Sequence, residues 1–142
     1  MAQATTKGGG DGDLRLQITK PAKRAGLVQE TDGEPDYMAE VYVYSFDGVL
    51  VILDKKVHMG RRADIISKAA GATESMHGGI PAKVAQAGNG YQVNLPEARP
   101  AGFEVGQDVR LRDADAMLVI HDGTNAGVAD DLEELRQEQM NN

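Results

Sequence analysis

The chain contains an internal repeat, and this repeat limits the folds that it can adopt. Residues 14–53 and 88–120 present the same order of strand, proline, short helix, glycine turn and hairpin. The matched residues are Gln17 and Gln92, Pro21 and Pro96, Gly26 and Gly102, and Leu50-Val51-Ile52 and Leu118-Val119-Ile120. A repeat has to be recognised before a fold is assigned, because each copy is one structural unit. The sequence therefore predicts a fold with two similar halves.

Within the repeats, short runs predict strands that are joined by tight turns. Residues 14–19 alternate apolar and polar side chains, as expected of a half-buried strand. Residues 40–46 are rich in β-branched and aromatic residues, and the Asp-Gly pair at 47–48 predicts a hairpin turn after them. The Asn-Gly pair at 89–90 predicts a second hairpin, because it supplies two residues that tolerate a left-handed backbone. The expected fold class is mainly β.

Two segments outside the repeats have helical character. Residues 61–70 carry apolar side chains at helical spacing, so a helix is expected between the two copies. Residues 128–140 are helical by propensity but have only a sparse apolar stripe, which predicts a marginal helix that becomes ordered on a partner. The chain is thus divided into a flexible N-terminal segment or first weak strand at 1–12, repeat one at 13–54, a basic connecting helix or linker at 55–79, repeat two at 80–123, and an acidic C-terminal helix or tail at 124–142.

The charge distribution bears on the class of partner. The net charge is −7, and an acidic chain is not a typical nucleic-acid binder. The charge is uneven: residues 1–54 are net −4, residues 55–99 are net +4 and residues 108–142 are net −6. The basic middle between two acidic ends is more informative about partners than the total.

The composition also indicates the cellular compartment of the protein. The chain has no cysteine, which rules out disulfides and thiolate metal sites and is compatible with the cytoplasm. No apolar run approaches the roughly 20 residues that a membrane-spanning helix needs. The polar, glycine-rich start lacks the apolar core of a secretion signal. We expect a cytoplasmic protein without membrane association.

No set of residues has the spacing of a catalytic or metal site. His58, His77 and His121 are isolated and are expected in loops or on the surface. The paired acids at 130–131 and 133–134 are expected to form a solvated helix face. The glycine-rich run GGGDGD lacks the Lys-Ser/Thr of a phosphate-binding loop. We therefore expect no enzymatic activity, no metal and no cofactor.

The stretch NLPEARPAGFEVGQDV, residues 94–109, resembles the AbrB/MazE (SpoVT-AbrB) family of swapped-hairpin β-barrels. The family pattern is a strand ending in Ile/Leu-Pro, a one-turn helix with Arg or Lys, Gly-apolar, Gly-Asp and a hairpin. Here Gln107 stands between the second glycine and Asp108. The resemblance implies a swapped-hairpin β-barrel built from two ββαββ-type half-barrel repeats, which interlock because one copy cannot bury its apolar face alone. A double-psi-like β-barrel, which also consists of two such halves, remains an alternative.

The resemblance further implies a set of DNA-binding residues. In the family, Arg and Lys near the first strand and the short helix neutralise phosphates, and Arg can read guanine edges. Carried over residue by residue, this set is Lys23, Arg24, Lys83 and Arg99, and the basic stretch 55–68 could extend it with Arg61 and Arg62. The loop arginine of the family is absent, since Tyr91 follows Gly90 instead, and this departure argues against sequence-specific recognition.

Two functions from different classes follow. The first is a small DNA-binding transcriptional regulator of the AbrB/MazE type, which would bind double-stranded DNA and could form a homodimer. The second is a protein-interaction module, either antitoxin-like or an adaptor barrel, that uses the acidic C-terminal helix to hold a protein partner.

Overall fold

The structure is a computed structural model of the chain. The part of the chain that it describes comprises residues 2–5, 7–8, 14–46, 48–60, 62–72, 76–88, 90–95, 102–123 and 126–140.

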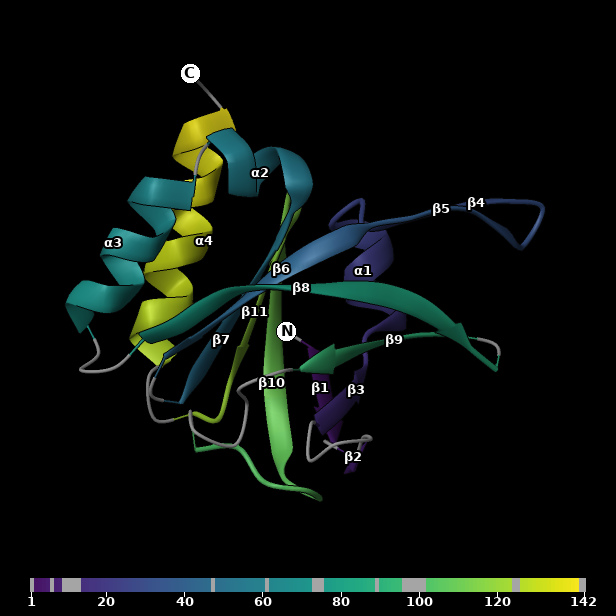
Figure 1. The fold of residues 1–142 in the computed structure, drawn as a ribbon, viewed down its shortest axis with the longest axis horizontal. Coiled ribbons are helices and arrows are strands. Elements are labelled where there is room, and N and C mark those ends of the chain that lie inside the picture. The colour runs from purple at the N-terminus through teal and green to yellow at the C-terminus, as the bar shows by residue number, and fades with distance from the viewer. Residues whose placement is uncertain are drawn as a thin grey trace.

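The fold is mainly β, as the sequence predicts, and nine of its described strands form one large antiparallel sheet (Figure 1). Along the sheet the strands follow the order β1-β10-β11-β7-β6-β8-β9-β3-β2. Their bounds are β1 (Ala2–Thr5), β2 (Lys7–Gly8), β3 (Leu14–Gln17), β6 (Glu40–Phe46), β7 (Val49–Asp54), β8 (Met76–Ala87), β9 (Gly90–Leu95), β10 (Asp108–Ala114) and β11 (Met117–His121).

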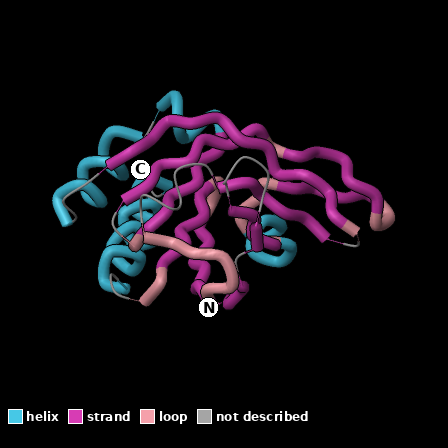
Figure 2. Tube along the Cα trace, turned by 60° about the horizontal axis from the view of Figure 1, so that its bottom comes forward, coloured by secondary structure: helices cyan, strands magenta, loops and turns pink. Residues whose placement is uncertain are grey.

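The two ends of this strand order are consecutive pieces of the N-terminal segment. β1 pairs with β10 and β2 pairs with β3, and only one residue of the chain separates β1 from β2. The strand order therefore returns to the segment from which it starts. Figure 2 shows the resulting curvature, in which the strands arch around the interior as a barrel-like layer.

Residues that the sequence matches between the two copies are paired with each other in the sheet. Gln17 of β3 is paired directly with Gln92 of β9, and Val51 of β7 is paired directly with Val119 of β11. Both pairs join residues that occupy matched positions in the two copies. Other neighbours in the sheet also come from different parts of the chain, since β6 of the first copy pairs with β8, and β10 of the second copy pairs with β1 of the N-terminal segment.

The sheet is buried on both faces where β7 and β11 run. Leu50 and Ile52 point into the interior of the curled sheet, whereas Val49, Val51 and Leu53 point outward into a second cluster. Three helices cover that outer cluster: α2 (Lys55–Gly60), α3 (Arg62–Ala72) and α4 (Ala126–Met140) (Figure 1). Because both faces are covered, these strands are continuous apolar runs and do not alternate. Each buried aliphatic side chain contributes about 1.5–3 kcal/mol to folding.

A short helix and a two-stranded hairpin occupy the remaining space. α1 (Thr19–Arg24) buries Pro21 and Ala22. β4 (Val28–Thr31) and β5 (Glu34–Met38) form a hairpin that we call the ribbon, and it projects from the body of the molecule (Figure 1). The ribbon turns at Asp32 and Gly33, whose φ values of 54° and 80° are those of a tight left-handed turn.

One predicted hairpin turn is confirmed and the other is displaced by one residue. Phe46 pairs with Val49 and Gly48 has a φ of 72°, as the Asp-Gly pair predicts. In the second copy Ala87 pairs with Gly90, so Gly90 already belongs to β9, and Gly88 before it has a left-handed φ of 61°. The physical reason is close packing: a Cβ on Gly90 would lie 2.3 Å from Thr19 Oγ1.

The helices also differ from their predictions. The connecting region was predicted to hold one helix at 61–70, but it contains two helices, α2 from Lys55 to Gly60 and α3 from Arg62 to Ala72. The C-terminal helix is not a free tail, since Ala129 and Leu132 are fully buried against the outer cluster. Within the described part of the chain, no helix is both long and apolar enough to cross a membrane.

Candidate nucleic-acid interface

The structure distributes the predicted cations over different elements. Lys23 and Arg24 are the last two residues of α1, and Lys83 is exposed on β8. Arg62 is the first residue of α3, which lies on the opposite side of the molecule from α1 (Figure 1). Arg61 and Arg99 fall outside the described residues. The DNA-binding roles of Arg61 and Arg99 therefore stay predictions.

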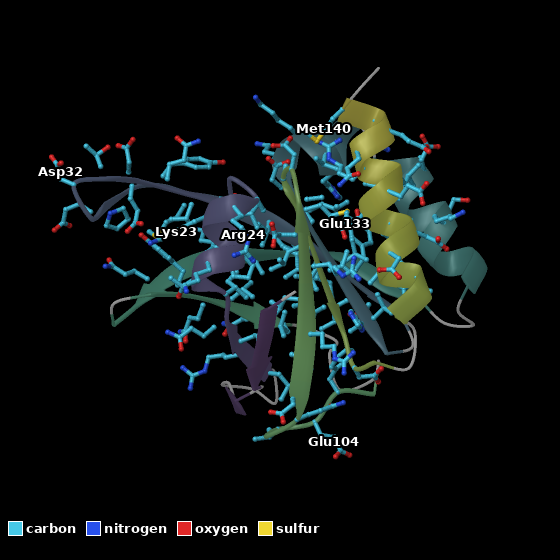
Figure 3. All side chains as sticks on the ribbon, turned by 180° about the vertical axis from the view of Figure 1, so that it is seen from behind. Lys23, Arg24, Asp32, Glu104, Glu133 and Met140 are labelled. Carbon is cyan, nitrogen blue, oxygen red and sulfur yellow. The ribbon has the colours of Figure 1, made fainter. Side chains whose placement is uncertain are left out.

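Both predicted cations on α1 are held by carboxylates. Lys23 Nζ lies 2.5 Å from Glu30 Oε1, and Arg24 donates from Nε and Nη2 to Asp113 Oδ1 at 3.0 and 2.8 Å. In Figure 3 the two side chains leave α1 in different directions, Lys23 toward the ribbon and Arg24 toward β10. These pairs compete with phosphate, so Lys23 and Arg24 are less available to a nucleic acid than the sequence alone indicates.

The Glu30 carboxylate joins α1, the ribbon and β9. Its second oxygen accepts a hydrogen bond from the Tyr91 hydroxyl at 3.0 Å. The hydrogen bond from Lys23, and then that from Tyr91, lower the pKa of Glu30 below its usual value. Burial, and then the neighbouring Glu30, raise the pKa of Tyr91. At neutral pH Glu30 is therefore a stable anion that keeps Lys23 in place.

A polar and exposed sheet face lies over the Gln17–Gln92 pair. Leu14 and Leu16 point inward, so Arg15 and Gln17 point outward. Across the sheet, Arg15 is paired with Asn94 and Gln17 with Gln92. The same face continues on β8 with Ala85, which is paired with Gln92, and with Lys83 two residues away. We call these outward side chains of β3, β9 and β8 the Gln17–Gln92 face.

The segments that build this face contain no acidic residue. The chain has 22 Asp and Glu residues, yet none occurs between Leu14 and Gln29 or between Met76 and Leu95. The same segments supply Arg15, Lys20 and Lys83, all of which are exposed. The nearest acid in the pairing register is Glu40 on β6, opposite Lys83. The Gln17–Gln92 face is therefore locally basic on an acidic protein.

Sequence reasoning missed Arg15 and Lys20 as candidates. Two signals in the sequence could have identified them. The alternation of residues 14–19 places Arg15 and Gln17 on the outer side of a strand, and the surrounding run is free of acid. Arg15 is also fixed in place, because its Nε and Nη2 donate to the Gly8 carbonyl at 3.1 and 3.0 Å.

The acids of α4 are partly engaged and not uniformly solvated. Arg112 of β10 forms ion pairs with Asp130 and with Glu133, the latter at 2.7 Å. The hydrogen bond to Glu133 is the main cause that raises the pKa of Arg112. Arg136 is nearly buried and donates from Nε to the Asp115 carbonyl at 2.7 Å. These contacts hold α4 on the helical side of the molecule, away from β3 and β9 (Figure 1).

The prediction of surface histidines is wrong for His58 and His121. His58 is buried and stacks on Tyr42 with ring centroids 3.8 Å apart, and its Nδ1 lies 2.5 Å from the Tyr44 hydroxyl. His121 is 1% exposed because it continues the apolar run of β11 beneath the helices. The side chain of His77 lies outside the described part. Among the described residues, no three His, Asp or Glu side chains gather as they would around a metal ion.

Comparison of the chain with protein-family models, with curated proteins and with solved structures finds no match.

Proposed function

We propose that this protein is a small DNA-binding transcriptional regulator of the AbrB/MazE type, with two swapped-hairpin half-barrels in one chain. One observation carries the proposal: an exposed, acid-free sheet face is centred on the Gln17–Gln92 pair. Duplex DNA has two antiparallel backbones related by local two-fold axes. A surface with an approximate two-fold of its own can approach both backbones in the same way.

The pairing of strands supports the swapped-hairpin part of the proposal. The β6–β7 hairpin of the first copy joins β8 of the second copy, and the β10–β11 hairpin of the second joins β1 of the N-terminal segment, which precedes the first copy. Each copy thus completes the other, as two chains do in a swapped-hairpin dimer. All of these pairings are antiparallel.

The chemistry of the face suits a duplex backbone. Arg15 and Lys83 of the face, together with Lys20 of α1, carry the positive charge that neutralises phosphates. The amides of Gln17, Gln92 and Asn94 are able to donate to phosphate oxygens or to base edges. Because few cations are present and the chain as a whole is acidic, we expect weak binding that depends steeply on salt.

The test is a titration of fluorescein-labelled duplex DNA, followed by anisotropy at several low salt concentrations. The variants are Arg15→Gln and Lys83→Gln, and the charge-matched control is Lys68→Gln, whose position on α3 is far from β3 and β9 (Figure 1). We expect each variant of the face to weaken binding and to reduce the logarithmic salt slope by about 0.9. Lys68→Gln should leave the slope unchanged.

Thermal melting of each variant shows whether the fold is intact. If the wild-type chain does not bind duplex DNA at low salt, the proposal is wrong. Equal losses in Arg15→Gln and Lys68→Gln would show that binding is not located on the Gln17–Gln92 face. Either result would favour the protein-interaction alternative, for which α4 offers exposed Asp131, Glu134, Glu138 and Met140.

A further inference from the structure

A cleft of about 600 Å³ lies between the ribbon, the end of α1, the β10–β11 turn and the start of α2. Its volume is within the range of small-molecule sites. Arg136 of α4 lines it from the helical side. The cleft is separate from the Gln17–Gln92 face, since none of its lining residues comes from β3, β8 or β9.

The floor of the cleft is held rigid by backbone hydrogen bonds. The Ala116 N–H donates to the Ala25 carbonyl at 2.7 Å, and the Asp54 N–H donates to the Ala116 carbonyl at 3.0 Å. Three elements that are distant in sequence are thus tied at one residue. Ala116 has a φ of 59°, which is rare for a residue with a side chain. Such a conformation persists only where the surrounding structure imposes it, and it is common at binding sites.

The two carboxylates that line the cleft, Asp54 and Asp115, already have a hydrogen-bond partner and an ion-pair partner. Asp54 Oδ1 accepts the Val57 N–H at 2.9 Å, and Asp115 Oδ2 lies 3.3 Å from Arg136 Nη2. Lys55 and Lys56 are exposed at the rim and have no ion-pair partner among the described residues. The positive charge that is left over in the cleft therefore comes from these two lysines.

One wall of the cleft is aromatic. Tyr37 of β5 is paired directly with Gln29 of β4, so the two side chains share one face of the ribbon, and both line the cleft. Tyr37 is 49% exposed, which leaves much of its ring open to contact. The described residues 102–107 of the second copy form turns and no strand, so they provide no counterpart of the ribbon. The aromatic wall is therefore found in the first copy. The ribbon of repeat one thus builds one side of the cleft.

We propose that the cleft binds a small aromatic carboxylate, with the carboxylate at Lys55 and Lys56 and the ring against Tyr37. A singly charged anion fits better than a phosphate monoester, which carries up to two charges. The reason is that Asp54 and Asp115 lie in the same cleft and reduce its positive potential. The exposed amide of Gln29 adds a hydrogen-bond donor beside the ring. This inference does not depend on DNA binding.

The probe is naphthoate, and the neutral naphthamide of the same shape is its ligand control. Amide NMR shifts of the full chain report where each compound binds and how tightly. We expect saturable naphthoate shifts that gather at Gly26, Gln29 and Ala116. Removing one lysine, as in Lys55→Gln or Lys56→Gln, should weaken binding about two- to fivefold, as expected of an exposed ion pair. Tyr37→Ala should weaken it roughly two- to tenfold through the lost ring contact.

Two further variants control for substitutions that lie outside the cleft. Met38→Ala removes an exposed apolar side chain beside Tyr37 that does not line the cleft, and Lys68→Gln removes an exposed lysine on α3. Both should bind naphthoate as the wild type does. Three results would each overturn the proposal: no saturable shifts at millimolar naphthoate, shifts that lie outside the cleft, or naphthamide binding as tightly as naphthoate.

Discussion

Arg24 donates two hydrogen bonds to a single carboxylate oxygen of Asp113, and this contact fastens α1 to β10 across 89 residues of sequence. The hydrogen bond to Asp113 is the main cause that raises the pKa of Arg24. The Arg24 side chain remains half-exposed, so solvent screens the pair. The Arg24 guanidinium therefore links α1 to β10 and is also a candidate phosphate ligand. Its ion pair with Asp113 competes with the binding of phosphate.

Neutralising Asp113 should release Arg24. We expect Asp113→Asn to lower the free energy of unfolding by about 0.5–1 kcal/mol, measured in urea, since the pair is near the surface. The same variant should bind duplex DNA more tightly at low salt. Asp131→Asn, on the exposed side of α4, is the control for the change in net charge. Equal gains in both variants would mean that Arg24 has only a structural role.

Gly90 should tolerate no side chain. A Cβ there would lie 2.3 Å from Thr19 Oγ1 and 2.9 Å from Gln17 Nε2. Thr19 Oγ1 is not free to move, because it accepts the Tyr91 N–H at 3.0 Å. We expect Gly90→Ala to cost about 1–3 kcal/mol of stability through overpacking. In a double-mutant cycle Thr19→Ala should recover part of that loss. Additive losses in the cycle would show that the clash is not with Thr19.

His121 should make stability fall in mild acid. Burial, and then the charges of Arg110 and Arg112, lower its pKa in the folded state, although Asp122 and Asp130 oppose this. Neither ring nitrogen has a hydrogen-bond partner among the described residues. The folded chain thus keeps the ring neutral, whereas the unfolded chain binds a proton near pH 6.5. The free energy of unfolding contributed by this residue therefore decreases as pH falls below about 6.5 toward the folded pKa.

The matching experiment compares the wild type with His121→Leu in urea at about pH 7.5 and about pH 5. The leucine removes two buried nitrogens that lack partners, so we expect the variant to be at least as stable at the higher pH. Its advantage should grow at the lower pH. An advantage that stays constant between the two pH values would show that His121 does not titrate in the manner described.

α4 should be a stable part of the free protein. Leu132 is fully buried, and we expect Leu132→Ala to cost about 2–5 kcal/mol. The exposed neighbour Glu134→Ala should change stability by less than about 0.5 kcal/mol. Amide exchange on the wild type supplies a second measurement, in which residues 129–136 should be protected. Rapid amide exchange at these residues would instead support the sequence-based prediction of a tail that becomes ordered only on a partner.

The mainly β fold and one of the two hairpin turns were accessible from sequence because they depend on local chemistry. The matched positions Gln17 and Gln92 prove to be neighbours in the sheet, and the Asp-Gly pair at 47–48 forms the predicted hairpin turn. The displaced turn at Gly88 follows from a tertiary constraint, since Gly90 is required where Thr19 approaches β9. No local pattern could show that contact, because the two residues are far apart in the chain.

The candidate site was less predictable than the fold. Arg24 was predicted from the short-helix pattern, but its acidic partner lies in another repeat, and periodicity carries no information about such pairs. His121 was expected at the surface because it was assessed as a single residue. Its position at the end of MLVIH, a run buried throughout, is the better guide. Arg15 and Lys20 could have been found from the alternation of residues 14–19 and the absence of acid around them, but the family pattern does not include these positions.

The pairing of Ala2 with Leu111 has a consequence for biosynthesis. β1 leaves the ribosome before β10, so the strand that it pairs with in the sheet is missing until β10 has been made. At about 5–20 residues per second this interval lasts roughly 5 to 20 s. The pair between β1 and β10 can therefore form only after most of the sheet has been synthesised.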